Sequence, residues 1–137
     1  MLSQGPVPTF VHGLVEYAAA ALFIVAPFLF GFEETSATAA SIVVGLLVLA
    51  FTAVSVLPTG LVKSVSVGVH VTADIVLAVL LVALPFVLGF RDEGAPTALF
   101  ITVGVLHLLV TIATRFPGRG GNGRDGSDPR DDREALA

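Results

Sequence analysis

Four long apolar stretches constrain the fold of this chain more than any other feature of its sequence. They cover residues 11–32, 37–57, 67–90 and 97–116. Each has roughly 20 residues or more, which lets a helix rising 1.5 Å per residue cross a hydrocarbon layer about 30 Å thick. The stretches are apolar all round, so lipid suits them better than water. We therefore predict four membrane-spanning helices.

The composition excludes several classes of protein. Of the 137 residues, 55% are hydrophobic and 13% are charged, whereas a water-soluble domain carries about 25% charged residues. An ordinary soluble enzyme is therefore excluded. The net charge of −4 argues against nucleic-acid binding, which needs clustered Lys and Arg. The chain has no cysteine, which removes disulfides and thiolate chemistry.

The sequence contains an internal duplication. Residues 11–32 align without a gap on residues 69–90 at an offset of 58, with His12 on His70 and Glu16 on Asp74. The same offset pairs Pro27 with Pro85, Phe28 with Phe86, and Gly31 with Gly89. Beyond this segment the offset becomes 59. Each repeat would form a two-helix hairpin, so the two repeats would be parallel and related by an axis along the membrane normal. The predicted fold is an all-α membrane four-helix bundle made of two parallel two-helix repeats.

The duplication sets the domain boundaries. We assign residues 1–10 to an N-terminal cytoplasmic segment, 11–58 to repeat 1, 59–66 to a linker, 67–117 to repeat 2 and 118–137 to a tail. The tail is rich in Gly, Asp and Arg and has almost nothing to bury, so we expect it to be disordered.

Basic residues predict the orientation. Lys63, Arg115, Arg119 and Arg124 lie on the side of the termini, against Arg91 alone on the other side. Since Lys and Arg favour the cytoplasmic side of a membrane, both termini should be cytoplasmic. The expected location is the plasma membrane of a prokaryote.

A recurring proline–aromatic step suggests a family. The step lies late in the first helix of each hairpin, with a glycine shortly after it, and reads Ala26-Pro27-Phe28 and Leu84-Pro85-Phe86. Over residues 11–117 this pattern resembles the SPW-repeat membrane proteins of bacteria and archaea. The resemblance implies an architecture and no catalytic residues. A proline inside a helix bends it, and we expect Phe28 and Phe86 to fill the space beside each bend. Gly31 and Gly89 should end the helices.

Two acidic residues lie inside the spans, and each follows a histidine by four positions. His12 and Glu16 therefore share one helix face, as do His70 and Asp74. Three interpretations stay open. In the first, the acids lie near helix N-termini and bond to the neighbouring histidine or water. In the second, all four residues converge as a proton or cation site. In the third, His12 and His70 ligate a metal or haem, for which no further ligand pattern exists.

Two further features concern packing. Ala37, Ser41 and Gly45 form a stripe of small residues that predicts close helix packing, either inside the chain or at an oligomer seam. His107 has Val48 as its repeat equivalent, and we interpret it as a helix–helix hydrogen-bonding residue.

From these observations we expect a non-enzymatic membrane protein with no catalytic residues, no cofactor and no metal. The favoured role is structural, as a homo-oligomer or as an accessory subunit of a larger membrane complex, with lipid and other membrane subunits as partners and no soluble substrate. The alternative is a small proton- or cation-coupled transporter or channel that uses Glu16 and Asp74.

Overall fold

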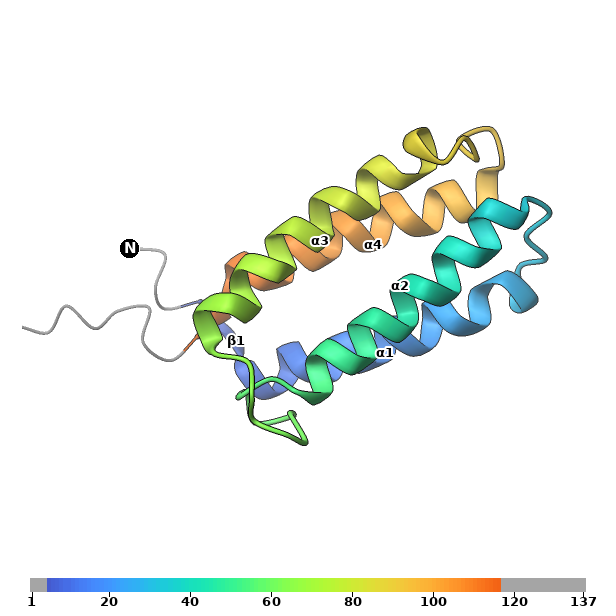
Figure 1. Ribbon diagram of the computed structural model, residues 1–137. Coiled ribbons are helices and arrows are strands. Elements are labelled where there is room, and N and C mark those ends of the chain that lie inside the picture. Colours follow the sequence, from blue (N-terminus) through green and yellow to red (C-terminus); the bar gives the residue numbers. More distant parts are fainter. Residues whose placement is uncertain (1–4, 117–137) are drawn as a thin grey trace, which may run out of the picture.

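The computed structural model describes residues 5–116 and contains four α-helices (Figure 1). They are α1 (Thr9–Leu29), α2 (Thr35–Ala53), α3 (Val67–Val87) and α4 (Gly94–Ala113). All four are long and apolar enough to cross a membrane, as predicted. The tail predicted over 118–137 and residues 1–4 lie outside the described residues.

The helices form two hairpins, one from α1 and α2 and one from α3 and α4. Figure 1 shows the hairpins lying side by side, with both interhelical turns at the same end of the molecule. Because each hairpin returns the chain to its starting end, the repeats are parallel. The predicted all-α bundle of two two-helix repeats is therefore confirmed.

Glycines end the first helix of each hairpin. Gly31 and Gly89 follow α1 and α3 with φ angles of +62° and +78°, a left-handed conformation that glycine adopts without a steric penalty. Phe32 N–H donates to the Pro27 carbonyl at 3.0 Å, a bond typical of such helix ends. The predicted role of both glycines is confirmed. The predicted apolar stretch extends beyond the observed end of α1 at Leu29 because the turn residues Phe30 and Phe32 are also apolar.

The two prolines face the protein interior, while the phenylalanines after them do not. Pro27 and Pro85 are buried inside α1 and α3, whereas Phe28 and Phe86 are 76% and 56% exposed. The expectation that these phenylalanines fill the space beside the bends is wrong. Successive side chains lie about 100° apart around a helix, so a buried proline turns its neighbour outward, where lipid would contact it.

Equivalent glycines bring the helices of each hairpin close together. A Cβ atom on Gly45 of α2 would lie 2.8 Å from the Ala20 carbonyl oxygen, and one on Gly104 of α4 would lie 3.0 Å from the Ala78 carbonyl oxygen. These contacts correspond under the offsets of 58 and 59. The duplication is thus present in the packing as well as in the sequence.

The small-residue stripe lies inside the first hairpin. Ala37, Ser41 and Gly45 are all buried, and the Ser41 hydroxyl donates to the Phe23 carbonyl at 2.5 Å. The stripe is therefore an internal contact between α1 and α2, one of the two possibilities that the sequence left open.

Aromatic side chains and one carboxylate join the hairpins towards the turns. The Phe100 ring packs edge-on against Phe23 and Phe90, with ring centroids 5.1 and 5.2 Å apart. At the turns, the Glu93 carboxylate accepts hydrogen bonds from the backbone N–H groups of Glu33 and Glu34 at 2.7 and 3.0 Å. Glu93 thus connects the second hairpin to the turn of the first.

Two short parallel pairings close the opposite end of the bundle, which the sequence did not predict. Strand β1 (Val7–Pro8) pairs with β2 (Thr114–Arg115), with Val7 opposite Thr114. An isolated bridge joins Ser55 to Val65. Val65 is the repeat equivalent of Val7, and Ser55 is that of Thr114. The start of each repeat therefore pairs with the end of the other.

Candidate functional site

Four buried polar side chains meet between the first helices of the two repeats. His12 and Glu16 come from α1, and His70 and Asp74 come from α3. Both histidines are fully buried, and the two acids are 3% and 2% exposed. The four residues lie four to eight positions into their helices, about 5–10 Å from the helix starts at 1.5 Å per residue. The structure thus brings together all the polar candidates that the sequence identified.

The contacts between these residues cross from one repeat to the other. His12 Nε2 lies 3.1 Å from Asp74 Oδ2, and His70 Nε2 lies 3.2 Å from Glu16 Oε1. Within each helix, the corresponding His–acid distance is 3.5 Å in both cases. Each histidine therefore contacts the acid of the opposite repeat more closely than its own. The interpretation that the four residues converge describes this geometry better than two separate pairs.

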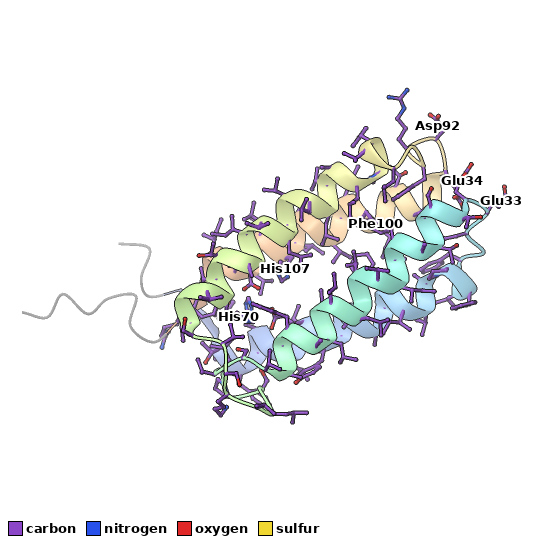
Figure 2. All side chains as sticks on the ribbon, viewed as in Figure 1. Glu33, Glu34, His70, Asp92, Phe100 and His107 are labelled. Carbon is purple, nitrogen blue, oxygen red and sulfur yellow. The ribbon has the colours of Figure 1, made fainter. Side chains whose placement is uncertain are left out.

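Side chains from the rest of the fold surround this cluster. The Thr52 hydroxyl lies 3.2 Å from Glu16 Oε2 and 2.8 Å from the Val48 carbonyl oxygen. The Thr114 hydroxyl lies 2.9 Å from His12 Nδ1. His107 Nε2 lies 3.6 Å from Asp74 Oδ1, and Figure 2 shows His107 and His70 between the two hairpins. His107 thus faces α3, but within residues 5–116 its Nε2 has no hydrogen-bond partner, so the predicted helix–helix hydrogen bond is not present.

The two histidines of the cluster have different surroundings. The His12 ring packs edge-on against Phe116, with centroids 5.2 Å apart, and its Nδ1 has Thr114 as partner. The His70 ring stacks on Phe51 at 5.4 Å, and within residues 5–116 neither of its nitrogens has a hydrogen-bond partner of good geometry. The duplication therefore supplies one histidine and one acid in each repeat, but the surroundings of the two histidines differ.

A cavity leads from the outside of the bundle to the carboxylates. It has a volume of about 170 Å³. Glu16 and Asp74 are among its lining residues, but most of its wall is apolar. The other lining residues are Leu47, Val48, Phe51, Thr52, Ala73 and Leu77, from α2 and α3. His107 stands at the repeat-equivalent position of Val48. The corresponding space between α1 and α4 is therefore occupied by an imidazole.

The charge of the acids is balanced within the cluster. In the part of the chain that the structure describes, the ion-pair partners of Glu16 and Asp74 are all histidines, and no Lys or Arg lies within 4.0 Å of either carboxylate. A charged side chain near the middle of a bilayer costs about 2.5–3.5 kcal/mol on insertion scales. Glu16 and Asp74 lie nearer the helix starts, where this cost is smaller, but both are buried away from water. Positive charge, as a proton on a neighbouring histidine or as another cation, would offset the cost of burying them.

Sequence reasoning missed several residues of the site. Thr52 contacts Glu16. Under the offset of 59 its equivalent is Thr111, so a hydroxyl recurs on the second helix of each hairpin, although the Thr111 hydroxyl donates to the His107 carbonyl instead. Thr114 carried a similar signal, since its repeat equivalent Ser55 is also a hydroxyl residue, but nothing in the sequence placed Thr114 or Phe116 next to His12.

The arrangement does not fit a haem. The ring centroids of His12 and His70 are 5.9 Å apart, and carboxylate oxygens lie within 3.1–3.5 Å of both Nε2 atoms. The space between the imidazoles, which a porphyrin plane would have to occupy, is filled by Glu16 and Asp74.

Comparison with known proteins bears on the family. A family model described as the SPW repeat domain matches residues 10–114. No curated protein and no solved structure matches the chain. The match covers the whole of both hairpins, including all four residues of the cluster.

Proposed function

The chain belongs to the SPW repeat family, and from this premise we propose that it is a small, non-enzymatic membrane transporter or channel for a cation, protons included. Glu16 and Asp74 would hold the cation inside the bilayer. We further propose that the protein lies in the plasma membrane of a prokaryote with both ends of the bundle core, at Thr9 and Ala113, facing the cytoplasm.

The observation that carries this proposal is the crossed contact of the four residues. His12 of repeat 1 meets Asp74 of repeat 2, and His70 of repeat 2 meets Glu16 of repeat 1, at 3.1 and 3.2 Å. Ionisable groups inside a membrane are rare and mark ion pathways when they face a bundle interior. A purely structural hydrogen bond would need one such pair, whereas this bundle buries two on its pseudo-symmetry axis.

The cavity supports the proposal by offering a route. It lies in the gap between α2 and α3 and is lined by residues that include Glu16 and Asp74. Phe51 and Phe116 lie against the histidine rings, and Phe23, Phe100 and Leu81 fill the interior towards the turns. In this proposal a cation therefore enters through the gap between α2 and α3, while apolar side chains separate the cluster from the turn end of the bundle.

A structural or accessory role, which the sequence favoured, has less support. The small-residue stripe that could have formed an oligomer seam is used inside the first hairpin. The outward-facing Leu, Val and Phe side chains would contact lipid as readily as another subunit. This role nevertheless predicts a stable larger species in detergent, which size-exclusion chromatography with light scattering would detect.

Flux through reconstituted protein tests the proposal. Proteoliposomes with the natural sequence should carry protons or metal cations, and Glu16→Gln or Asp74→Asn should reduce that flux at least about tenfold, equivalent to a barrier about 1.4 kcal/mol higher. Asp92→Asn is the matched control, because the Asp92 side chain is 94% exposed in a turn. Absence of flux from the natural sequence for protons and for mono- and divalent cations would contradict the proposal.

A further inference from the structure

The four buried side chains present a ring of atoms that can bind a metal. His12 Nε2, Glu16 Oε1, His70 Nε2 and Asp74 Oδ2 all lie within 4.8 Å of one another. Nitrogen and oxygen alternate around this ring, and its four N···O edges measure 3.1, 3.2, 3.5 and 3.5 Å. No cysteine or water is needed to complete four ligands.

These edges match the dimensions of a four-coordinate zinc-type centre. Zn²⁺ binds imidazole nitrogen and carboxylate oxygen at about 2.0–2.2 Å, so neighbouring ligand atoms of a tetrahedral site lie about 3.3–3.5 Å apart. The four N···O edges of 3.1–3.5 Å agree with this spacing, whereas the distances across the ring extend to as much as 4.8 Å. The opposite ligand atoms would therefore move towards each other when an ion binds in tetrahedral geometry.

An unsatisfied buried nitrogen independently indicates a missing ligand. His70 is fully buried, and its Nε2 lies 3.2 Å from Glu16 Oε1, but among the described residues neither this contact nor any other has the geometry of a hydrogen bond. A buried polar atom without a partner costs about 1–3 kcal/mol. Coordination of a cation by this nitrogen would remove the penalty.

The surrounding hydroxyl groups orient the ligand atoms for coordination. The Thr114 hydroxyl donates to the Val110 carbonyl at 2.6 Å, so at 2.9 Å it accepts from His12 Nδ1–H. This assignment puts one ring proton of His12 on Nδ1. Nε2 donates a second proton to the Asp74 carboxylate at 3.1 Å, and a bound metal ion would replace that proton. The Thr52 hydroxyl contacts Glu16 through Oε2, which leaves Oε1 directed into the ring. Such outer contacts are characteristic of metal ligands.

We propose that His12, Glu16, His70 and Asp74 bind one divalent transition-metal ion of the zinc class. This inference rests on the proposed function, since it names the cation held at the same site. Two imidazoles and two carboxylates suit Zn²⁺ and its neighbours, whereas Ca²⁺ and Mg²⁺ prefer six or more oxygen ligands. Two ionised carboxylates also neutralise a charge of +2, so the loaded site would carry no net charge inside the bilayer.

Metal binding to detergent-purified, chelator-stripped protein tests this directly. Titration with Zn²⁺ against a chromogenic competitor should give one ion per chain, and Co²⁺ should give the visible absorption of a tetrahedral centre. Asp74→Asn and Glu16→Gln should each weaken Zn²⁺ binding at least about 100-fold. Circular dichroism and size-exclusion chromatography would verify that both variants keep the fold.

A second set of variants tests whether the Thr114 hydroxyl acts by orienting the His12 ring and not by supporting the fold as a whole. Thr114→Val should weaken Zn²⁺ binding about 10- to 100-fold, the usual effect of removing an outer-shell partner, and Thr114→Ser should restore it. Thr72→Val is the matched control, because Thr72 lies on α3 between His70 and Asp74 but is exposed and bonds only to the Gly68 carbonyl. Its affinity should equal that of the natural protein.

The outcomes distinguish this inference from the proposed function. Proton flux from a protein that binds neither Zn²⁺ nor Co²⁺ would overturn the metal site and leave the transport proposal intact. Stoichiometric Zn²⁺ binding without flux of any cation would support the site and contradict transport. Zn²⁺ binding that is unchanged in Asp74→Asn and Glu16→Gln would place the ion elsewhere and overturn the inference.

Discussion

His12 Nε2 and Asp74 Oδ2 lie 3.1 Å apart although the two residues are 62 positions apart in the sequence. The contact joins the first helix of one repeat to the first helix of the other. Its counterpart, between His70 and Glu16, has nearly the same length. The site therefore exists only when both repeats are packed together, and no single hairpin contains it.

The glycines that separate the helices within each hairpin should resist substitution. In Gly45→Ala, the new Cβ would lie 2.8 Å from the Ala20 carbonyl oxygen and 2.7 Å from Ile24 Cγ1, so the hairpin must open. Overpacking of this kind costs about 1–3 kcal/mol. Thermal unfolding in detergent measures the loss. The control is Gly68→Ala, where nothing lies within 4 Å of the added atom and alanine should be neutral or stabilising by up to about 1 kcal/mol. Equal melting temperatures for the two variants would refute the close approach.

The carboxylate of Glu93 should stabilise the contact between the hairpins at the turns. Glu93→Ala removes the acceptor of two backbone N–H groups, those of Glu33 and Glu34. The bonds are charge-assisted but lie at the surface, so we expect a loss of about 1 kcal/mol in the free energy of unfolding. Asp92→Ala, next to it in the same turn, removes a side chain that is 94% exposed and should leave the melting temperature unchanged. The prediction fails if both variants behave alike.

Single cysteines can determine the orientation, because the natural chain has none. Asp92→Cys lies in the turn between α3 and α4, and Val62→Cys lies in the linker at the opposite end, where Val62 is 59% exposed. With Lys63 and Arg115 on the cytoplasmic side, a membrane-impermeant maleimide added to intact cells should modify only the cysteine at 92. After lysis it should modify both. Labelling of position 62 alone in intact cells would show that the protein has the opposite orientation, with the linker outside.

The cavity between α2 and α3 should control the rate at which a cation reaches the site. Ala73→Leu extends a side chain into a space of about 170 Å³ lined by Ala73 itself. We expect cation flux in proteoliposomes to fall at least about tenfold, which needs a barrier only about 1.4 kcal/mol higher, while Zn²⁺ affinity at equilibrium stays the same. Ala21→Leu, an equal change at an exposed position of α1, is the control. Normal flux through Ala73→Leu would show that the cavity is not the route.

Much of the fold could be read from the sequence for a clear physical reason. Helices in lipid must be apolar over about 20 residues, so their existence and number follow from composition along the chain. The duplication gave the parallel arrangement of the hairpins, and the left-handed conformation of Gly31 and Gly89 followed from glycine at a helix end. The outward direction of Phe28 and Phe86 was misjudged, because it depends on which side of each helix the proline is packed.

The candidate site was predictable only in part. The spacing of four between each histidine and acid placed both on one face, but it could not decide between pairs within a helix and pairs across the bundle. That choice depends on how α1 and α3 are rotated towards each other. The repeat has a hydroxyl residue at both Ser55 and Thr114, but the contact of Thr114 with His12 could not be predicted, since Thr114 belongs to a two-residue strand beyond the last helix.

The reciprocal pairing of Val7 with Thr114 and of Val65 with Ser55 has a consequence for chain topology. The first and last described segments, β1 and β2, pair with each other in the same way as the two ends of the linker, Ser55 and Val65. A peptide that joined the chain ends could therefore replace the linker as the connection between the hairpins. A circular permutant that joins residue 116 to residue 5 by a short peptide, and is cut within residues 61–63, would present the second hairpin first. It should insert into the membrane and form the same cluster of histidines and acids, since the contacts between the hairpins do not depend on which hairpin comes first in the chain.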